Sequence, residues 1–340
     1  MPATMKALVL DAHGPIDDLR LRPDHEIPEV TPGHVLVRVT AASFNHHDIF
    51  TVRGMPGIRL PLPVIIGLDM AGEVAEVGEG VDGWVPGDRV VVVPLASDGH
   101  LMGEMHDGGM AQYCLVEAEQ LVRLPDEVSD VQAAALPVAY GAAHRMMVGK
   151  GAVHTGDKVL VLGASGGVGT ACVQLARGMG CHVVAAAGSE EKGRALLELG
   201  ADEFLDYTQH DIAQWVREHH GKPHRFDSGP GMDVVVNFTG GDTWAPTLRS
   251  VGRGGRILVC GASAGYDPVE DLRYIFSFEL QIIGSNAFEK SDIEQLVALV
   301  AEGRLDPVIG AELALDEAVE GLRMMERRGV FGKVVVRPWA

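Results

Sequence analysis

A glycine-rich segment between an apolar run and a helical pattern constrains the fold of this chain more than any other feature. The segment VLVLGASGGVGTA spans residues 159–171, and its four glycines stand at positions 163, 166, 167 and 169. Glycines let the backbone turn sharply and approach a pyrophosphate, whose charge is stabilised at the N-terminus of the helix that follows. A second apolar run, HVVAAAG at 182–188, arrives where a βαβ unit has its second strand. The segment therefore predicts a dinucleotide-binding loop, rather than a turn that only packs a helix on a strand.

Apolar runs alternate with helical patterns throughout the region that contains this loop. Because these runs are apolar at nearly every position, they predict a parallel sheet that is covered by helices on both faces. Six such strands make a complete doubly wound domain of the Rossmann type, in a chain of the α/β class. The expected strands span residues 158–164, 182–188, 203–207, 233–240, 255–263 and 281–285.

The regions on either side have a different rhythm, with short β-rich runs separated by Gly and Pro. The runs before the loop span 34–43, 69–78, 88–94 and 111–117, and the tail has a helix at 291–303 and a strand at 331–338. A chain of 340 residues is too long for one ordinary core, so two domains are expected. We expect a β-rich domain formed by residues 1–131 and 286–340, and a dinucleotide-binding domain formed by residues 132–285.

The composition limits the partners of this chain. The formal net charge of −19 argues against nucleic acids and anionic membrane surfaces. No apolar run approaches the ~20 residues that a membrane-spanning helix needs, and the N-terminal sequence MPATMKALVL lacks the profile of a signal peptide. Four cysteines without a C-x-x-C pair fit a reducing compartment. We therefore expect a cytoplasmic protein that acts on a small molecule.

The end of the second apolar run decides which nicotinamide cofactor fits. An NAD site usually has an Asp or Glu there to hold the ribose 2′-hydroxyl. This sequence has Ala187 instead, and Lys192 can supply positive charge to a 2′-phosphate. Glu190 and Glu191 compete for the ribose, but they are better explained as first-turn residues of a helix whose N-cap is Ser189. The pattern favours NADP(H) over NAD(H).

Several motifs together resemble the medium-chain dehydrogenase/reductase superfamily over nearly the whole chain. Zinc-containing members carry G-H-E-x-x-G-x-x-x-x-x-G-x-x-V, and residues 67–81 keep this spacing with Leu68 and Asp69 in place of the His and Glu. The resemblance implies a GroES-like catalytic domain joined to a Rossmann domain, with NAD(P)H between them, in a dimer. The nearest branch is that of the quinone oxidoreductases, which are similar to zeta-crystallin. Other similar segments are VPGDRV (85–90), DGGMAQY (107–113), LPVAYGAAH (136–144) and FGKVVV (331–336).

The resemblance also implies which residues hold the cofactor. In the quinone oxidoreductase branch a Lys and a Tyr help to hold the 2′-phosphate, and Lys192 and Tyr207 stand at matching positions. The full set of expected cofactor residues is Gly163, Ala164, Ser165, Gly166, Gly167, Val168, Gly169, Ser189, Lys192, Tyr207, Asn237, Gly261, Phe331 and Lys333.

The superfamily has two zinc sites, and this sequence keeps the ligands of neither. The catalytic ligand positions map to Asn45, Leu68 and approximately Val138, and the side chains of Leu and Val cannot coordinate zinc. The four cysteines of the structural zinc lobe would lie within residues 95–106, where LASDGHLMGEMH has none. We therefore expect no bound zinc at either place.

A different metal is a less favoured alternative. Neighbouring residues on a strand point to opposite faces, so two adjacent histidines do not by themselves make a site. The candidate ligands for such a metal are His46, His47, Asp48, Asp69 and His106.

Without a Lewis acid, the developing negative charge of the substrate must be one that an ordinary hydrogen-bond donor can stabilise. Quinones and α,β-unsaturated carbonyls fit, because hydride addition delocalises the charge onto a carbonyl oxygen. The candidate catalytic donors are Asn45, His47 and Tyr140, and His47 suits proton delivery because the pKa of a histidine is ordinarily near 6.5. An equally open interpretation makes His47 a surface residue. Asp48 and Asp69 are expected to be hydrogen-bonded structural acids.

The expected activity is therefore NADPH-dependent reduction of a quinone or enone without zinc. Two alternatives stay open: an alcohol dehydrogenase-like reductase of simple aldehydes or ketones, and a non-catalytic NADPH-binding protein. The segment LQIIGSNAF at 280–288 is expected to end the parallel sheet, and its apolar edge is expected to pair with a second copy in a homodimer.

Overall fold

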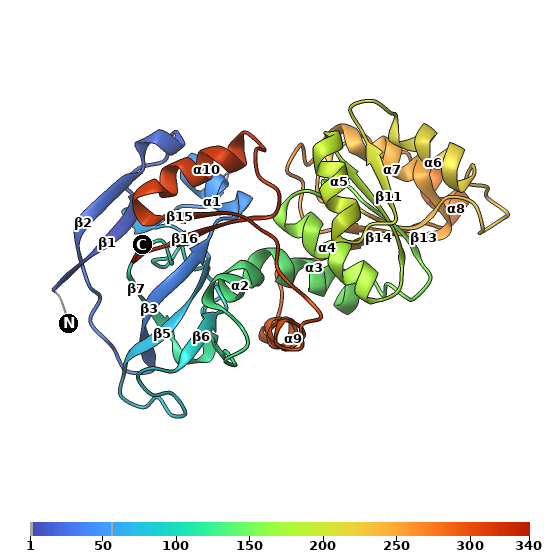
Figure 1. Ribbon diagram of the computed structural model, residues 1–340. Coiled ribbons are helices and arrows are strands. Elements are labelled where there is room, and N and C mark those ends of the chain that lie inside the picture. Colours follow the sequence, from blue (N-terminus) through green and yellow to red (C-terminus); the bar gives the residue numbers. More distant parts are fainter. Residues whose placement is uncertain (1–2, 56) are drawn as a thin grey trace. The chain divides into compact units, whose positions relative to one another are not determined.

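The computed structural model describes residues 3–55 and 57–340, which form two compact units (Figure 1). Unit 1 contains the residues up to Ala139 together with Glu289–Ala340, and unit 2 is Tyr140–Phe288. The first boundary lies eight residues beyond the expected end at residue 131, because helix α2 (Asp130–Ala135) packs on strands β3 (His34–Ser43) and β5 (Asp69–Val77) of unit 1. The second boundary, at Glu289, lies three residues after the expected one.

Unit 2 is built on a six-stranded sheet in which all strands are parallel. The strand order is β11-β10-β9-β12-β13-β14, which is the 3-2-1-4-5-6 order of a doubly wound dinucleotide-binding domain. The six strands expected from the sequence are thus confirmed. Their bounds are β9 Lys158–Val161, β10 His182–Ala187, β11 Glu203–Asp206, β12 Met232–Val236, β13 Val251–Val259 and β14 Gln281–Gly284.

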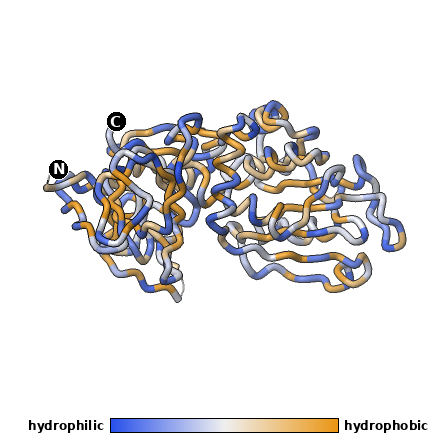
Figure 2. The backbone as a smooth tube through the Cα atoms, turned by 90° about the horizontal axis from the view of Figure 1, so that it is seen from below, coloured by the Kyte–Doolittle hydropathy of each residue, from blue (hydrophilic) through white to orange (hydrophobic). Residues whose placement is uncertain are grey.

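Helices cover this sheet in two groups, which explains why its central strands β9, β10 and β12 are mostly buried and apolar. Helices α4 and α5 contact each other, and α6, α7 and α8 form a second contacting series (Figure 1). The side chains of Leu160, Val235 and Trp215 belong to one buried cluster beneath the second series. In Figure 2, the hydrophobic colour follows stretches inside the unit and the hydrophilic colour gathers at outer loops. The helices of unit 2 are α3 Gly141–His144, α4 Gly167–Gly178, α5 Glu190–Leu199, α6 Ile212–His220, α7 Trp244–Ser250 and α8 Leu272–Phe278.

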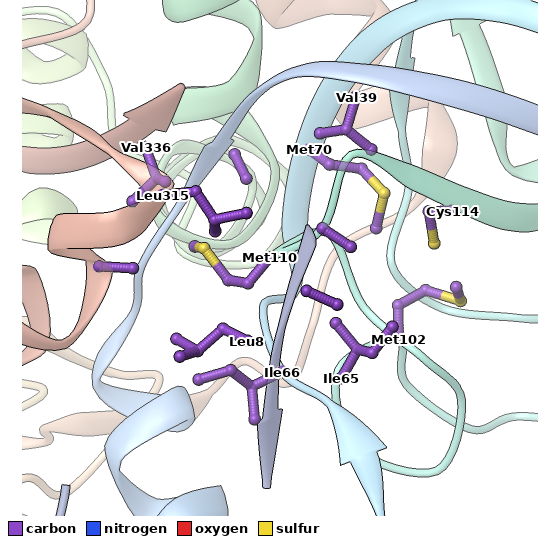
Figure 3. Close-up of a cluster of buried hydrophobic side chains, with 14 of the residues drawn as sticks. Leu8, Val39, Ile65, Ile66, Met70, Met102, Met110, Cys114, Leu315 and Val336 are labelled. Carbon is purple, nitrogen blue, oxygen red and sulfur yellow. The ribbon is translucent and has the colours of Figure 1, made fainter. Parts of the chain in front are cut away.

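Unit 1 has two sheets around a core of aliphatic and Met side chains. The larger sheet has the order β15-β16-β3-β5-β6-β8, with β7 also paired to β3, and the smaller has the order β2-β1-β4. Figure 3 shows Leu8, Met110 and Leu315, from three distant parts of the chain, pointing toward one another in this core. The remaining elements of the unit are β1 Thr4–Leu10, β2 Arg20–Glu26, β4 Val64–Ile65, β6 Arg89–Val92, β7 Tyr113–Glu117, β8 Leu121–Arg123, β15 Ile309–Ala314, β16 Lys333–Arg337, α1 His46–Arg53, α9 Lys290–Ala301 and α10 Ala318–Glu326.

The C-terminal tail completes the larger sheet of unit 1. Strand β16 pairs antiparallel with β3, through Val335 opposite Ser43 and Val336 opposite Ala42. This pairing carries Lys333, the first residue of β16, to the end of β3 and the start of α1. Among the helices of residues 3–55 and 57–340, none is long and apolar enough to cross a membrane.

Candidate functional site

The glycine-rich loop of unit 2 has the shape that a phosphate group needs. After β9 the chain turns at Gly163, whose φ of +66° lies in the left-handed region that favours glycine. Gly166 is the N-cap of α4 and offers no side chain over the helix terminus. A Cβ on Gly169 would lie 2.3 Å from the Gly163 carbonyl oxygen, so only glycine lets the helix approach the strand this closely. Residues 165–168 are half-buried, so the amide groups at the start of α4 are accessible to an anion.

A second group of expected cofactor residues gathers where β10 and β11 end. Ser189 is the N-cap of α5, and its hydroxyl accepts a hydrogen bond from the Lys192 backbone N–H at 3.3 Å. Tyr207 follows β11, and a Cβ on Gly188 would lie 2.8 Å from its hydroxyl oxygen. Glu190 and Glu191 occupy the first turn of α5, as expected from the sequence. Ser189, Lys192 and Tyr207 thus all follow the carboxyl ends of β10 and β11 in unit 2.

Asn237 was expected to contact the cofactor, but its side chain is buried and hydrogen-bonded within unit 2. It is fully buried, and its amide nitrogen donates to the hydroxyls of Thr243 and Thr247 at 3.1 and 2.9 Å. Its amide oxygen accepts from the backbone N–H groups of Thr239 and Gly240, each at 3.0 Å. The side chain therefore shapes the loop after β12, and its polar atoms are engaged within that loop. A Cβ on Gly261 would meet no atom nearer than 3.6 Å, so packing within the protein does not require glycine at this position. The space beside its backbone is open to a ligand.

In unit 1, a buried network joins four segments of the chain at the end of β3. Asp69 is fully buried, and one of its oxygens accepts hydrogen bonds from Ser43 Oγ at 3.0 Å and Asn45 Nδ2 at 2.8 Å. The other oxygen accepts from the Val138 backbone N–H at 2.9 Å. Lys333 Nζ lies 3.0 Å from the Asp69 carboxylate and forms a buried ion pair with it. Asp69 is thus a hydrogen-bonded structural acid.

Lys333 has a role that differs from the expected cofactor contact. Besides Asp69, its ammonium donates to the Phe44 carbonyl oxygen at 2.8 Å and to Asn45 Oδ1 at 2.6 Å. An ammonium has three N–H donors, and these three acceptors use all of them. Lys333 therefore fixes the side chain of Asn45 in unit 1. Phe331, two residues earlier, is half-buried.

The residues at the expected zinc-ligand positions do not fit zinc. Leu68 is buried and apolar, and Val138 takes part in the network through its backbone N–H. Both polar ends of the Asn45 side chain are engaged, one with Lys333 and the other with Asp69. The positive charge beside Asn45 is supplied by the Lys333 ammonium.

His47 forms a close pair with Glu104, a residue that the sequence did not single out. His47 Nε2 lies 2.7 Å from Glu104 Oε2, and the Glu104 side chain is 7% exposed while that of His47 is 30% exposed. Burial disfavours the charged imidazole, but the hydrogen bond to Glu104 and the negative charges of Asp48 and Glu104 outweigh it and raise the pKa of His47. His47 is therefore a partly accessible acid held in one orientation by a buried carboxylate.

The Asp48 side chain caps the N-terminus of α1. Its Oδ2 accepts from the Asn45 backbone N–H at 2.7 Å, which caps the helix, while its Oδ1 is buried without a hydrogen-bond partner among the described residues. Burial raises the pKa of Asp48 to about 7, with the hydrogen bond from Asn45 acting in the opposite direction. Asp48 is thus a structural acid, as expected.

His106, a possible metal ligand with His47 in the sequence, instead pairs with Asp98, and the distance from its Nε2 to Asp98 Oδ2 is 2.9 Å.

Tyr140, the third expected donor, is fully buried in unit 2. Its hydroxyl donates to Gln174 Oε1 at 2.9 Å, from the start of α3 to α4. A tyrosine with no exposed surface and an engaged hydroxyl is a packing residue between helices. Of the three expected donors, His47 has a side chain that is 30% exposed, whereas Asn45 and Tyr140 are buried.

Comparisons with known proteins agree with this architecture. Residues 31–126 match the family model described as "Alcohol dehydrogenase GroES-like domain", and residues 167–302 match the one described as "Zinc-binding dehydrogenase". An acryloyl-coenzyme A reductase of Sulfurisphaera tokodaii is 30% identical over 98% of this chain and 100% of its own length. A quinone oxidoreductase of Lama guanicoe is also 30% identical, over 98% of this chain and 97% of its own.

Two solved structures extend the likeness to the fold. An NAD-dependent alcohol dehydrogenase superposes with a TM-score of 0.90 at 38% identity, covering 98% of this chain and 99% of that one. The 2-octenoyl-CoA carboxylase reductase CinF, in complex with NADP and 2-octenoyl-CoA, superposes with a TM-score of 0.86 at 27% identity, covering 99% of this chain and 88% of that one. With its GroES-like unit, its doubly wound sheet and its glycine-rich loop, this chain belongs to the medium-chain dehydrogenase/reductase superfamily of oxidoreductases.

Proposed function

We propose that this protein reduces a conjugated carbonyl compound with NADPH, and that His47 supplies the proton that completes the reduction. Bound NADPH supplies the hydride, which adds to the β-carbon of the acceptor. The negative charge that results is delocalised onto the carbonyl oxygen, so a protonated imidazole is sufficient to stabilise it. The observation that carries this proposal is the pair formed by His47 Nε2 and Glu104 Oε2 at 2.7 Å.

Glu104 holds the His47 ring by one nitrogen and leaves the other for the substrate. Because an ionised carboxylate only accepts hydrogen bonds, Nε2 keeps its proton toward Glu104, and Nδ1 is the atom that exchanges a proton with the substrate. The raised pKa of His47 keeps the ring protonated to a higher pH than an ordinary histidine. Asn45 is the N-cap of the helix that carries this histidine, and both ends of its side chain are fixed, so we propose that it shapes the pocket beside the carbonyl group.

The pH dependence of turnover tests the role of the pair. Glu104→Gln removes a cause that raises the pKa of His47, so the pKa falls and the proton donor is lost at a lower pH. The alkaline limb of kcat should therefore move to lower pH, and His47→Gln should lower kcat on the order of tenfold, because water can replace the imidazole in part. NADPH affinity should stay within about twofold in both variants.

Asp98→Asn is the matched control, because it removes an exposed carboxylate from the same loop without touching His47. Its pH profile should equal that of the parent. If Glu104→Gln and His47→Gln both keep the parent rate and the parent profile with a conjugated acceptor, the pair is structural and the proposal fails.

The relatives support enones, quinones and enoyl thioesters as the substrate class. The acryloyl-CoA reductase and the quinone oxidoreductase act, by their names, on acceptors of two kinds that share a conjugated carbonyl group. An apolar Leu68 and Val138 at the ligand positions favour chemistry that does not need zinc. The similarity to an NAD-dependent alcohol dehydrogenase keeps the reduction of simple aldehydes or ketones as the second candidate.

NADP(H) is the proposed cofactor, supported by Lys192 in the first turn of α5, by Tyr207 directly after β11 and by the NADP complex of CinF. Lys192→Ala should weaken NADPH binding roughly tenfold, or about 1.4 kcal/mol, and leave NADH binding unchanged, because only NADPH carries the 2′-phosphate. Fluorescence titration of both nucleotides measures this. Equal losses for NADPH and NADH would contradict the assignment of the phosphate pocket.

We also propose a homodimer formed through the edge of the unit 2 sheet. Strand β14 pairs only with β13 among the described strands, and Ile282 on it is 42% exposed. On the adjacent helix α8, Leu272 and Phe276 are 64% and 70% exposed, which extends the apolar surface. Ile282→Lys should convert the dimer to a monomer in light scattering, whereas a parent protein that is already a stable 36.2 kDa species would contradict the proposal.

The four unpaired cysteines support a cytoplasmic location.

A further inference from the structure

A second cluster of metal-binding side chains lies in unit 2, at the end of the sheet opposite the glycine-rich loop. His182 is the first residue of β10, Glu203 is the first residue of β11, and His220 is the last residue of α6. The two parallel strands are neighbours, so their amino ends bring His182 and Glu203 together. The glycine-rich loop instead follows the carboxyl end of β9, so the cluster is separate from the cofactor site.

We propose that His182, Glu203 and His220 bind a divalent transition-metal ion of the zinc class. The ligand atoms, one from each residue, all lie within 4.8 Å of one another. His182 Nε2 lies 2.6 Å and His220 Nε2 lies 3.2 Å from Glu203 Oε1. Zinc at about 2.0–2.2 Å from each ligand would hold tetrahedral ligands roughly 3.3 Å apart, so small side-chain shifts make room for it. Two imidazoles and a carboxylate leave a fourth position for water.

An unsatisfied buried atom points to a ligand at this place. The His220 side chain is only 8% exposed, and its Nε2 makes no hydrogen bond within the described part of the chain despite facing the Glu203 carboxylate. Buried polar atoms in native proteins are nearly always satisfied, and each exception needs a cause. A metal ion between His220 and Glu203 would satisfy this nitrogen.

A second carboxylate lies near the far nitrogen of His182. Asp202 Oδ2 lies 3.7 Å from the Nδ1 of His182, on the side away from the cluster, and it also accepts from the Val183 backbone N–H at 2.7 Å. A carboxylate on the far nitrogen of a histidine orients the ring and makes it a better ligand. His182 is 41% exposed and Glu203 29% exposed, so an ion can enter from solvent. Bound metal would fasten the C-terminus of α6 to the amino ends of β10 and β11.

Cobalt(II) titration of the full-length protein, followed by visible absorption and competed with zinc(II), tests the proposal. We expect one equivalent per chain, and a rise of the thermal unfolding midpoint with zinc. Glu203→Gln and His182→Ala should each weaken binding by at least roughly tenfold and abolish the thermal rise, and Asp202→Asn should weaken binding roughly 10- to 100-fold. The partly exposed His182 keeps the test valid if a variant of His220 does not fold.

Two controls identify the site. His210→Ala removes an exposed histidine that precedes α6 and should bind as the parent does. His106→Ala disrupts the other cluster, Asp98, His100 and His106, whose members are exposed or half-buried, and it should also bind as the parent does. Parent-like binding by Glu203→Gln and His182→Ala, loss of binding in His106→Ala, or no stoichiometric binding to the parent would each overturn the proposal.

Discussion

Lys333→Met should destabilise unit 1 by roughly 3–5 kcal/mol, because it leaves the carboxylate of Asp69 buried without its cation. Lys333 and Asp69 are 2% and 0% exposed, and their charged groups lie 3.0 Å apart. The hydrogen bonds of Asp69 with Ser43, Asn45 and Val138 remain, but they do not neutralise the charge. The same variant frees Asn45 Oδ1, so the Asn45 side chain keeps only the hydrogen bond from its Nδ2 to Asp69. Urea denaturation measures the loss as a lower midpoint.

Lys6→Met is the matched control for that measurement. Lys6 also pairs with an aspartate, Asp316, at 2.8 Å, but the two side chains are 40% and 58% exposed. Exposed ion pairs contribute about 0–1 kcal/mol, so this variant should denature close to the parent. If Lys333→Met loses no more stability than Lys6→Met, the buried network does not organise unit 1.

Gly169→Ala should cost both stability and cofactor binding. The added Cβ would lie 2.3 Å from the Gly163 carbonyl oxygen and 2.6 Å from two backbone atoms of Ala164, so the loop must move. Overpacking of this kind costs roughly 1–3 kcal/mol. Because we propose that these amides bind the cofactor phosphates, NADPH affinity should fall roughly 10- to 100-fold.

Gly178→Ala is its control on the same helix. A Cβ on Gly178 would meet nothing within 4 Å, and Ala is the better helix former by about 0.5–1 kcal/mol. This variant should bind NADPH as the parent does and be no less stable. Unchanged nucleotide binding by Gly169→Ala would mean that the loop does not hold the cofactor phosphates.

Much of unit 2 could be predicted from sequence because local patterns determine it. The central strands β9, β10 and β12 of its parallel sheet are mostly apolar runs, and the helix after Ser189 begins with an N-cap and two acids. The turn at Gly163 and the close approach of α4 to β9 at Gly169 both require glycine, so the shape of the loop could be predicted from residue types alone. Strand β2 of unit 1 was not predicted, because it is mostly exposed and carries charged side chains.

The roles of individual side chains depend on tertiary partners and could not be predicted in the same way. Lys333 meets Asp69, which lies 264 positions earlier in the chain, only because β16 pairs with β3. A lysine that begins the apolar run KVVV indicates a buried cation, but the sequence does not indicate which acid pairs with it. Glu104 lies in an irregular loop, so no periodicity marked it as buried beside His47. Tyr140 was expected to donate a hydrogen bond to the substrate, but it is fully buried and its hydroxyl donates to Gln174 instead.

One measurement tests the proposed function most directly: NADPH oxidation with a matched panel of enones, quinones, enoyl-CoA thioesters and simple aldehydes, with and without a strong chelator. We predict that a conjugated acceptor has the highest kcat/KM and that the chelator leaves this rate unchanged. We also predict that the same acceptor loses turnover in His47→Gln. A wide preference for simple aldehydes, or a rate that disappears with the chelator, would contradict zinc-independent reduction of a conjugated carbonyl.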